Sequence, residues 1–503
     1  MSSPSSRTPM SNAPAKPSIQ TAMSSGMWSA IDIVVRQSMT FGISVALARL
    51  LTPSDFGAVA LLAFFSGLSV VFVQSGLATA LIQRQDIGFA EENAVFWANM
   101  AMAGTLAAIV VLSSPVIARF YGIPVLQPLL LVAAAQIVIS ALCSVHISLV
   151  NRDLRFDITT KVGLISSACS GLAALASALA GWGVWALALQ ILVAAAATTV
   201  AFWVISDWRP SWKIDLRPLG PLWRFGAYLS LSGVLEVIYA QGFALLVGKL
   251  HGIHELGLFN RASTTQALPG GILSAIIGRV ALPLFSSRTG DAEALTKGLR
   301  ISLRLALLGS VPLVVGLALT ADLVMVCLFG VQWIKAAPIL RILAFAGVFL
   351  PFHVLNLQML LALGRSGEFL HLEIQKKVIG IAGAVIGSLF GIEGLAYALV
   401  FGSVASLVLN ARPIGRLIGY PLGRQLLDVA DIALATGLMS LCVLFASSRL
   451  RLDPWTTLIT LVAAGGLVYV MCIVLLPTPS FREARQIARD MVSARLPRTR
   501  SGN

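Results

Sequence analysis

The stretch MWSAIDIVVRQSMTFGISVALARLLTPSDFG, from Met27 to Gly57, decides the fold. Its apolar part is long enough to cross a bilayer, since a transmembrane helix needs about 20 residues at ~1.5 Å each. Two charged residues, Asp32 and Arg36, lie well inside the apolar run. A charge at that depth costs roughly 2.5–3.5 kcal/mol on insertion scales, so both side chains should face protein or water. The stretch therefore predicts a membrane helix whose polar face lines a substrate path.

The rest of the chain is as apolar as this stretch. Hydrophobic residues make up 57% of the sequence and charged residues only 12%, about half the ~25% that is usual in soluble domains. The sequence therefore predicts an all-α polytopic membrane protein with about fourteen transmembrane helices. The predicted spans are residues 27–50, 58–83, 94–118, 125–149, 158–180, 182–205, 225–248, 258–285, 299–320, 335–361, 367–390, 392–411, 425–447 and 455–476.

The net charge of +14 could indicate a nucleic-acid partner, but the placement of the basic residues does not. Most of the 36 Lys and Arg residues lie in the two tails or at span ends that are predicted to be on the same side of the membrane as the tails. Because basic residues gather on the cytoplasmic side, this bias predicts that both termini are cytoplasmic. We expect a multi-pass protein of the bacterial inner membrane with no nucleic-acid partner.

Several kinds of chemistry lack their sequence signatures. There is no G-x-x-x-x-G-K-[ST] loop for ATP and no G-x-S-x-G elbow for a nucleophilic serine. The five histidines show no metal-binding spacing, and the five cysteines lie in or beside apolar spans without a C-x-x-C pair. The sequence therefore predicts no catalytic residue, no metal site, no cofactor and no enzymatic activity.

Two internal echoes indicate a duplication. ALARLLTPSDFG aligns with ALLVGKLHGIHELG at an offset of 200, which matches Arg49 with Lys249 and Gly57 with Gly257. RFYGIPVLQPLL, before the fourth span, resembles CLFGVQWIKAAPIL, before the tenth. Two such matches in the same order predict two six-helix lobes related by a pseudo-two-fold axis along the membrane normal, with two extra C-terminal helices. The predicted parts are a disordered cytoplasmic tail (1–25), an N-lobe (26–205), a cytoplasmic linker (206–224), a C-lobe (225–416), helices thirteen and fourteen (417–477) and a basic cytoplasmic tail (478–503).

Three arginines are the candidate substrate-binding residues. Arg36 lies in the first span, and Arg261 and Arg279 lie eighteen residues apart in the eighth, on one face of a helix. Arginine binds phosphate bidentately, so such a set suits an anionic head group. The structural alternatives are a self-neutralising pair of Arg36 with Asp32, and snorkelling of the other two arginines to the membrane interfaces.

Carboxylates inside spans form a second candidate set. Asp32 and Glu236 could couple an ion or tune the cavity, because burial raises a carboxyl pKa into a useful range. Pairing of Glu236 with Arg36 across the repeat interface is the structural alternative. Four further groups are interpreted as helix-end or bundle contacts: Arg341, His353, Glu373 and the pair Lys376–Lys377.

The strings ARLLTPSDFGAVAL, GLATALIQRQDI, ARFYGIP, NRDLRF and LGLFNRAS resemble the polysaccharide transporters, the Wzx-like flippases of the multidrug/oligosaccharidyl-lipid/polysaccharide exporter superfamily. The resemblance runs from about residue 27 to 477. It implies twelve core helices in two lobes, usually with two more, and a cavity whose cationic residues hold a diphosphate; here Arg36 and Arg261 offer these charges. It also implies that an undecaprenyl-diphosphate-linked oligosaccharide moves to the outer leaflet by alternating access, for exopolysaccharide, capsule or O-antigen (lipopolysaccharide) synthesis. The implied partners are the lipid-linked oligosaccharide, membrane lipids and, as further candidates, a polysaccharide polymerase and chain-length proteins.

Two alternatives stay open. A drug/cation antiporter of the same superfamily would favour an acidic, aromatic pocket over arginines in the path. A membrane-embedded polysaccharide polymerase or ligase would need a large external loop with catalytic residues, whereas the predicted external loops are short.

Overall fold

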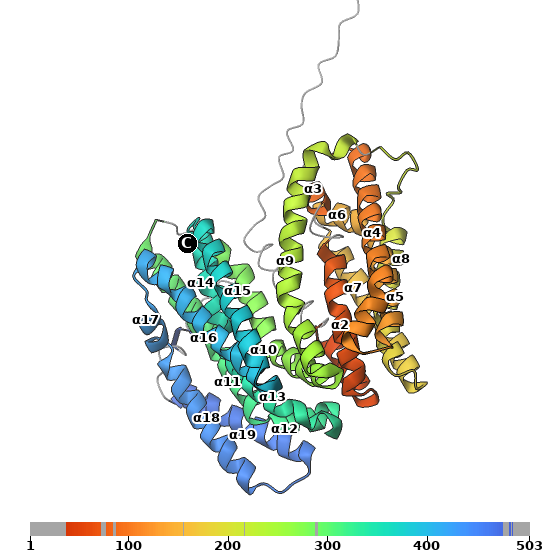
Figure 1. The fold of residues 1–503 in the computed structure, drawn as a ribbon. Helices are drawn as coiled ribbons and strands as arrows, with labels where there is room; N and C mark the ends of the chain where they lie inside the picture. Colours follow the sequence, from red (N-terminus) through yellow and green to blue (C-terminus); the bar gives the residue numbers. More distant parts are fainter. Residues whose placement is uncertain are drawn as a thin grey trace, which may run out of the picture.

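The computed structural model describes residues 37–71, 77–83, 87–153, 155–215, 217–286, 290–475, 482, 483 and 485. These residues form helices joined by turns, with no strand in the described ranges, as predicted (Figure 1). The first part contains a helix over 37–50, then α2 (Pro53–Val70), α3 (Leu77–Gln83), α4 (Phe89–Tyr121), α5 (Leu126–Ala141), α6 (Ser144–Arg152), α7 (Phe156–Leu179), α8 (Val184–Ile205) and α9 (Gly220–Leu250).

The second part contains α10 (Gly252–Ser286), α11 (Ala292–Leu319), α12 (Ala321–Val324), α13 (Ala337–Val348), α14 (Leu350–Ala362), α15 (Ser366–Ser388), α16 (Gly391–Ile418), α17 (Leu422–Leu427), α18 (Ala430–Arg449) and α19 (Pro454–Leu475). A π-helical turn (Met325–Phe329) and a 3-10 helix (Val331–Ala336) connect α12 to α13. Each of the fourteen predicted spans overlaps a described helix or helix pair. Ten of the described helices are long and apolar enough to span a membrane, and the bent pair α5–α6 (42°) is an eleventh, so the count of fourteen stays a prediction.

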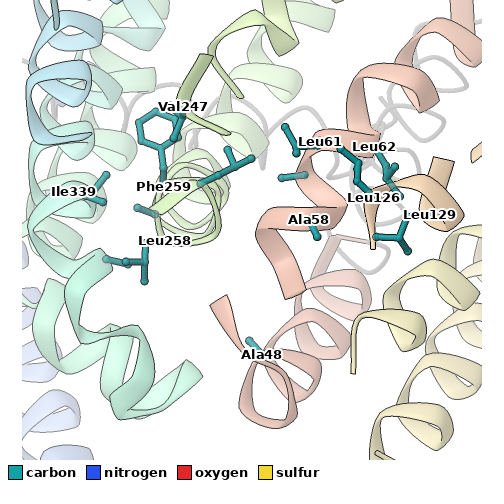
Figure 2. Packing of buried hydrophobic residues seen from close by; sticks show 14 of the residues in the cluster. Ala48, Ala58, Leu61, Leu62, Leu126, Leu129, Val247, Leu258, Phe259 and Ile339 are labelled. Carbon is teal, nitrogen blue, oxygen red and sulfur yellow. The ribbon is translucent and has the colours of Figure 1, made fainter. Parts of the chain in front are cut away.

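Figure 1 shows two bundles, one of α2–α8 with α9 beside it and one of α10–α19. They meet at the lower end of the view and diverge toward the upper end. We call the lower end, which holds residues 49–57 and 249–257, the joined end. One buried apolar cluster contains residues of both bundles, among them Leu61 of α2, Val247 of α9 and Phe259 of α10 (Figure 2). Burial of this shared apolar surface therefore holds the bundles together at the joined end.

The closest approach of the two bundles lies between Gly57 of α2 and Gly257 of α10. A Cβ added to Gly57 would lie 1.8 Å from the carbonyl oxygen of Ile253, and one added to Gly257 would lie 1.8 Å from that of Pro53. The contact is reciprocal, and both pairs obey the offset of 200 found in the sequence. The crossing therefore lies on a local two-fold axis, which confirms the predicted repeat at this point.

Local hydrogen bonds stabilise the N-terminus of α2 at the joined end. Thr52 caps α2, whose first helical residue is Pro53, and the Asp55 carboxylate accepts hydrogen bonds from the Thr52 N–H (2.9 Å) and Oγ1 (2.7 Å). This capping box satisfies amide groups that a helix end leaves unpaired. It sets the direction in which α2 leaves the crossing.

The position of α9 bears on the predicted lobes. Along its length α9 packs on α2 and α3, with Gly233 against Val71 and Gly226 against Leu77, and it also contacts α15. The boundary between the predicted N-lobe and C-lobe at 206–224 therefore stays a prediction. The added helices α18 and α19 pack on each other and on α11, where the Tyr469 hydroxyl donates to the Leu308 carbonyl (2.7 Å).

Candidate functional site

The structure describes part of the predicted site. Asp32 and Arg36 lie outside the described residues. The backbone of Arg279 is part of α10, but its side chain is outside the described set. Arg261 and Glu236 are described in full and lie in different surroundings, so each is treated in turn.

Arg261 lies at the joined end in a box of aromatic rings. Its guanidinium carbon is 4.3 Å from the ring centroid of Phe56, 4.7 Å from Phe329 and 5.2 Å from Trp333. Nη1 donates to Ser44 Oγ at 2.7 Å, and only 4% of the residue is exposed. Among the residues that the structure describes, no carboxylate forms an ion pair with it. Cation–π attraction and one hydroxyl thus replace the counter-ion that a buried charge usually needs.

The two bundles build this box together. Ser44 and Phe56 come from the first bundle, whereas Phe329 and Trp333 belong to the second, as Arg261 does. Closure of the joined end therefore covers the arginine. In this conformation the predicted substrate-binding charge is shut away from any ligand.

Arg49 and Lys249, which are equivalent in the repeat, link the two bundles by hydrogen bonds on either side of the crossing. Arg49 Nε donates to the Leu328 carbonyl at 2.9 Å, and its Nη2 donates to the Cys327 carbonyl. Lys249 Nζ donates to the Phe120 carbonyl and lies 4.1 Å from the centroid of the Phe120 ring. Matching Gly122 with Gly330 in the second echo makes Phe120 equivalent to Leu328. On each side of the crossing, the cation of the first echo in one bundle thus contacts the aromatic-glycine turn of the second echo in the other bundle.

The physical reason for these contacts is the same on both sides. Gly122 ends α4 with a φ of 70°, and Gly330 ends the π-helical turn with a φ of 103°, backbone conformations that favour glycine. The last carbonyl groups before each glycine have no partner within their own helix. A cation from the other bundle satisfies them and interacts favourably with the negative end of the helix dipole. We call these contacts the Arg49 junction and the Lys249 junction.

Glu236 is paired with a lysine in the middle of the helices. It forms an ion pair with Lys377 of α15, and the Lys377 ammonium lies 5.1 Å from the Tyr239 ring centroid. The side chains are 62% exposed for Glu236 and 29% for Lys377. Next to this pair, Lys376 binds Glu373 on the same helix, with exposed fractions of 14% and 28%.

The Glu236–Lys377 pair confirms the interpretation of Lys377 as a bundle contact and contradicts its interpretation as a helix-end residue. Lys377 lies at the middle of α15 (Ser366–Ser388), not at a helix end. The signal that could have found it is the pair of adjacent lysines near the centre of the predicted span 367–390. Arg341 and His353 are confirmed as bundle contacts, since Arg341 pairs with Asp322 and His353 Nε2 lies 3.0 Å from Ser403 Oγ. No group of three or more His, Cys, Asp or Glu in the described part of the chain could hold a metal ion.

Known solved structures share this fold. A lipid II flippase, MurJ, in an inward closed conformation matches with a TM-score of 0.74 at 14% identity, covering 93% of this chain and all of that one. An inward-facing multidrug resistance MATE family transporter of the MOP superfamily matches with a TM-score of 0.60 at 17% identity, covering 78% of this chain and 99% of that one. At these identities the likeness concerns the fold.

Sequence relatives are proteins of polysaccharide synthesis. The teichuronic acid biosynthesis protein TuaB of Bacillus subtilis is 25% identical over 90% of this chain and 95% of its own. The succinoglycan biosynthesis transport protein ExoT of Rhizobium meliloti is 26% identical over 92% of this chain and 95% of its own. The lipopolysaccharide biosynthesis protein WzxC of Escherichia coli is 25% identical over 65% of this chain and 67% of its own. The model of the family described as polysaccharide biosynthesis protein matches residues 46–338, more than half of the sequence. The chain therefore belongs to this polysaccharide biosynthesis protein family.

Proposed function

We propose that this protein is a flippase that moves a lipid-linked oligosaccharide from the inner to the outer leaflet of the bacterial inner membrane. The carrier would be undecaprenyl diphosphate, and the product would serve exopolysaccharide, capsule or O-antigen synthesis. The relatives named for teichuronic acid, succinoglycan and lipopolysaccharide support the substrate class. Since these are three different glycans, they leave the sugar of this protein open.

The observation that carries the proposal is the exposed Glu236–Lys377 pair. Glu236 lies in Ser230–Leu250, the part of α9 that is long and apolar enough to cross the membrane, Lys377 lies at the middle of the 23-residue α15, and the Glu236 side chain is 62% exposed. An ionised group at that depth cannot face hydrocarbon, so the space beside α9 and α15 must contain water. A polar head group too large and hydrated to cross hydrocarbon unaided needs such a space.

The closed joined end supports alternating access as the mechanism. The distribution of Lys and Arg predicts that the joined end faces outward, so the present conformation would accept substrate from the cytoplasm. Opening of the joined end would uncover Arg261, which with Arg36 and Arg279 would then hold the diphosphate. Both termini would be cytoplasmic, and a polymerase and chain-length proteins would receive the product.

The energy source is a separate part of the proposal. Without a P-loop, the protein would use an ion gradient, with Asp32 and Glu236 as the candidate carboxylates, or the consumption of product by later enzymes. Translocation in proteoliposomes after collapse of the proton and sodium gradients separates the two. Transport that persists without either gradient would rule out ion coupling.

A translocation assay tests the function itself. Purified protein is reconstituted in vesicles with the lipid-linked oligosaccharide of its own host, and a membrane-impermeant lectin reports sugar that reaches the other leaflet. We expect protein-dependent lectin labelling of the sugar and no glycosyl transfer. Drug or cation exchange without lipid movement would indicate an antiporter instead, and glycosyl transfer by the purified protein would indicate a polymerase or ligase.

A further inference from the structure

We propose that Lys377 binds the diphosphate of the lipid-linked substrate, and that Glu236 holds its ammonium group until the diphosphate displaces the carboxylate. This inference rests on the proposed function, because it takes the diphosphate carrier from it. It assigns Glu236 the role of a displaceable counter-ion in place of ion coupling. Five observations carry it: depth, exposure, packing, the chemistry of the pair and the helices that the pair connects.

The pair lies inside the helices, away from their ends. Lys377 is about 16 Å from either end of α15, and Glu236 is about 9 Å from the nearer end of Ser230–Leu250, the membrane-spanning part of α9, at 1.5 Å per residue. A head group that crosses the membrane must pass this level. A cation here lies where an anionic group is least stable in hydrocarbon and gains most from a counter-charge.

The position of the pair is built by close packing. A Cβ added to Gly380 would lie 2.6 Å from the Tyr239 hydroxyl oxygen, so α9 and α15 touch beside the pair. The Tyr239 ring also lies 5.1 Å from the Lys377 ammonium. Tyr239 therefore holds the lysine at a fixed place through a contact that does not depend on Glu236.

The pair is suited to exchange its anion. Exposed ion pairs contribute little net stability, so the Lys377–Glu236 bond is easily replaced. A diphosphate carries more negative charge than one carboxylate and offers several oxygens to an ammonium group. Glu236 is more exposed than Lys377, so its carboxylate can be displaced into water without being buried unpaired.

The exchange has a mechanical consequence. Glu236 belongs to α9, which packs on α2 and α3, whereas Lys377 belongs to α15 in the other bundle. Displacement of Glu236 removes the ionic link between these helices. Arrival of the substrate would thus loosen the contact between the bundles at mid-depth, and a movement of one bundle against the other could follow.

The neighbouring pair provides a matched control. Lys376 and Glu373 have the same charges, the same helix and nearly the same depth as Lys377, but both belong to α15. Their bond is local to one helix and connects nothing else. Loss of Lys376 should therefore change the charge of the region without removing the site.

The test measures equilibrium binding of radiolabelled undecaprenyl diphosphate, without sugar, to the full-length protein in lipid nanodiscs. We expect K377M to bind at least about tenfold more weakly, because it loses one charge-assisted contact, and K376M to stay within about twofold of the wild type. E236Q should bind more tightly than the wild type, because the lysine no longer has to leave a carboxylate. K377R keeps the cation and should retain binding, which guards against misfolding of K377M as the cause.

Opposite results overturn the inference in distinct ways. If K377M binds like the wild type, or if E236Q weakens binding as K377M does, the pair is only a link between helices and the inference is wrong. In that case lectin-detected translocation by the wild type would continue and the proposed function would stand. If the wild type binds no undecaprenyl diphosphate and moves no lipid-linked sugar, the proposed function itself fails.

Discussion

The Arg49 junction and the Lys249 junction occupy equivalent positions in the sequence repeat, yet they contain different numbers of hydrogen bonds. At the Arg49 junction, Gln332 Nε2 also donates to the Ala48 (2.8 Å) and Leu51 (3.0 Å) carbonyls, and Trp333 Nε1 donates to the Ala48 carbonyl at 2.8 Å. At the Lys249 junction, one further bond joins the Tyr121 hydroxyl to the Leu245 carbonyl at 3.3 Å. The backbone crossing and the cation–carbonyl contacts are shared, whereas the surrounding side chains differ.

The difference separates the contacts that both junctions make from those that only one junction makes. The shared contacts use the backbone and one long cation, so they need only the helix ends in place. The additional bonds gather on one side, so the Arg49 junction should hold the bundles more firmly than the Lys249 junction. We expect the second junction to separate first when the joined end opens.

The largest effect should come from the shared crossing. Gly57→Ala places a methyl group 1.8 Å from the Ile253 carbonyl oxygen, and Gly257→Ala does the same at Pro53, so the helices must move apart. Overpacking against backbone should cost about 3 kcal/mol or more and lower the ratio of closed to open molecules roughly a hundredfold. Nitroxide labels at the exposed residues Trp182 and Val331 measure that ratio through the distribution of distances between the bundles.

The matched control for the crossing is Gly42→Ala, since no atom lies within 4 Å of a Cβ at Gly42. It should leave the distance distribution unchanged. If the two crossing variants also close normally, or if only one of them opens the joined end, the local two-fold contact does not govern closure.

How far the sequence predicted this end depends on the kind of contact. The offset of 200 predicted that Gly57 and Gly257 are equivalent, and the structure adds that they touch. An alignment shows which residues are equivalent but not which residues are close together. It therefore could not predict that Arg49 contacts Leu328 or that Lys249 contacts Phe120. Those meetings depend on how two bundles pack, which no local pattern encodes.

A second prediction concerns the buried charge of Arg261, with an effect opposite in sign. Arg261 sits in the aromatic box without a carboxylate in the described residues, so closure buries a cation that only rings and Ser44 compensate. Methionine fills similar space without a charge, and such replacements of buried charges are often neutral or stabilising by 1–4 kcal/mol. Arg261→Met should therefore favour the closed joined end by about 2 kcal/mol and block transport.

The same pair of spin labels and the translocation assay measure both consequences. Arg261→Lys keeps a charge in the box and serves as the control, with a smaller change in the closed fraction. A lower closed fraction in Arg261→Met would mean that the cation–π contacts stabilise closure more than burial of the charge opposes it. In either case the burial of Arg261 was outside the reach of the sequence, because Phe56 and Trp333 are distant in the chain.

The third prediction compares the two cations directly. Arg49→Met removes donors to two carbonyls and a contact 5.9 Å from the Trp455 ring centroid, whereas Lys249→Met removes one donor and a contact with the Phe120 ring. Charge-assisted bonds at exposed sites should contribute about 1 kcal/mol, so Arg49→Met should lower the ratio of closed to open molecules roughly fivefold and Lys249→Met about half as much. Equal effects would contradict the inferred difference between the junctions, and high salt should weaken both.

The partner of Glu236 shows a further limit of the sequence. The apolar spans predicted the helices well, because hydropathy and length alone decide them. The rotation of each helix about its axis is set by tertiary packing, such as Gly380 against Tyr239. The choice of Lys377 as the partner of Glu236 follows from that rotation, and a span list cannot supply it.

The smallest effects should come from the bonds that differ between the junctions. Trp333→Phe keeps an aromatic ring in the Arg261 box but removes the donor to the Ala48 carbonyl, and Tyr121→Phe removes the donor to Leu245. Hydrogen bonds between membrane helices average about 0.6 kcal/mol, and the 3.3 Å bond of Tyr121 should be the weaker. Trp333→Phe should thus lower the ratio of closed to open molecules roughly threefold, and Tyr121→Phe less than twofold. Combined with Arg49→Met, Trp333→Phe should give less than the sum of the two free-energy changes, because bonds of one junction support each other and the loss of either already weakens the other. If the two free-energy changes are strictly additive, the bonds of the Arg49 junction are independent and do not form one cooperative unit.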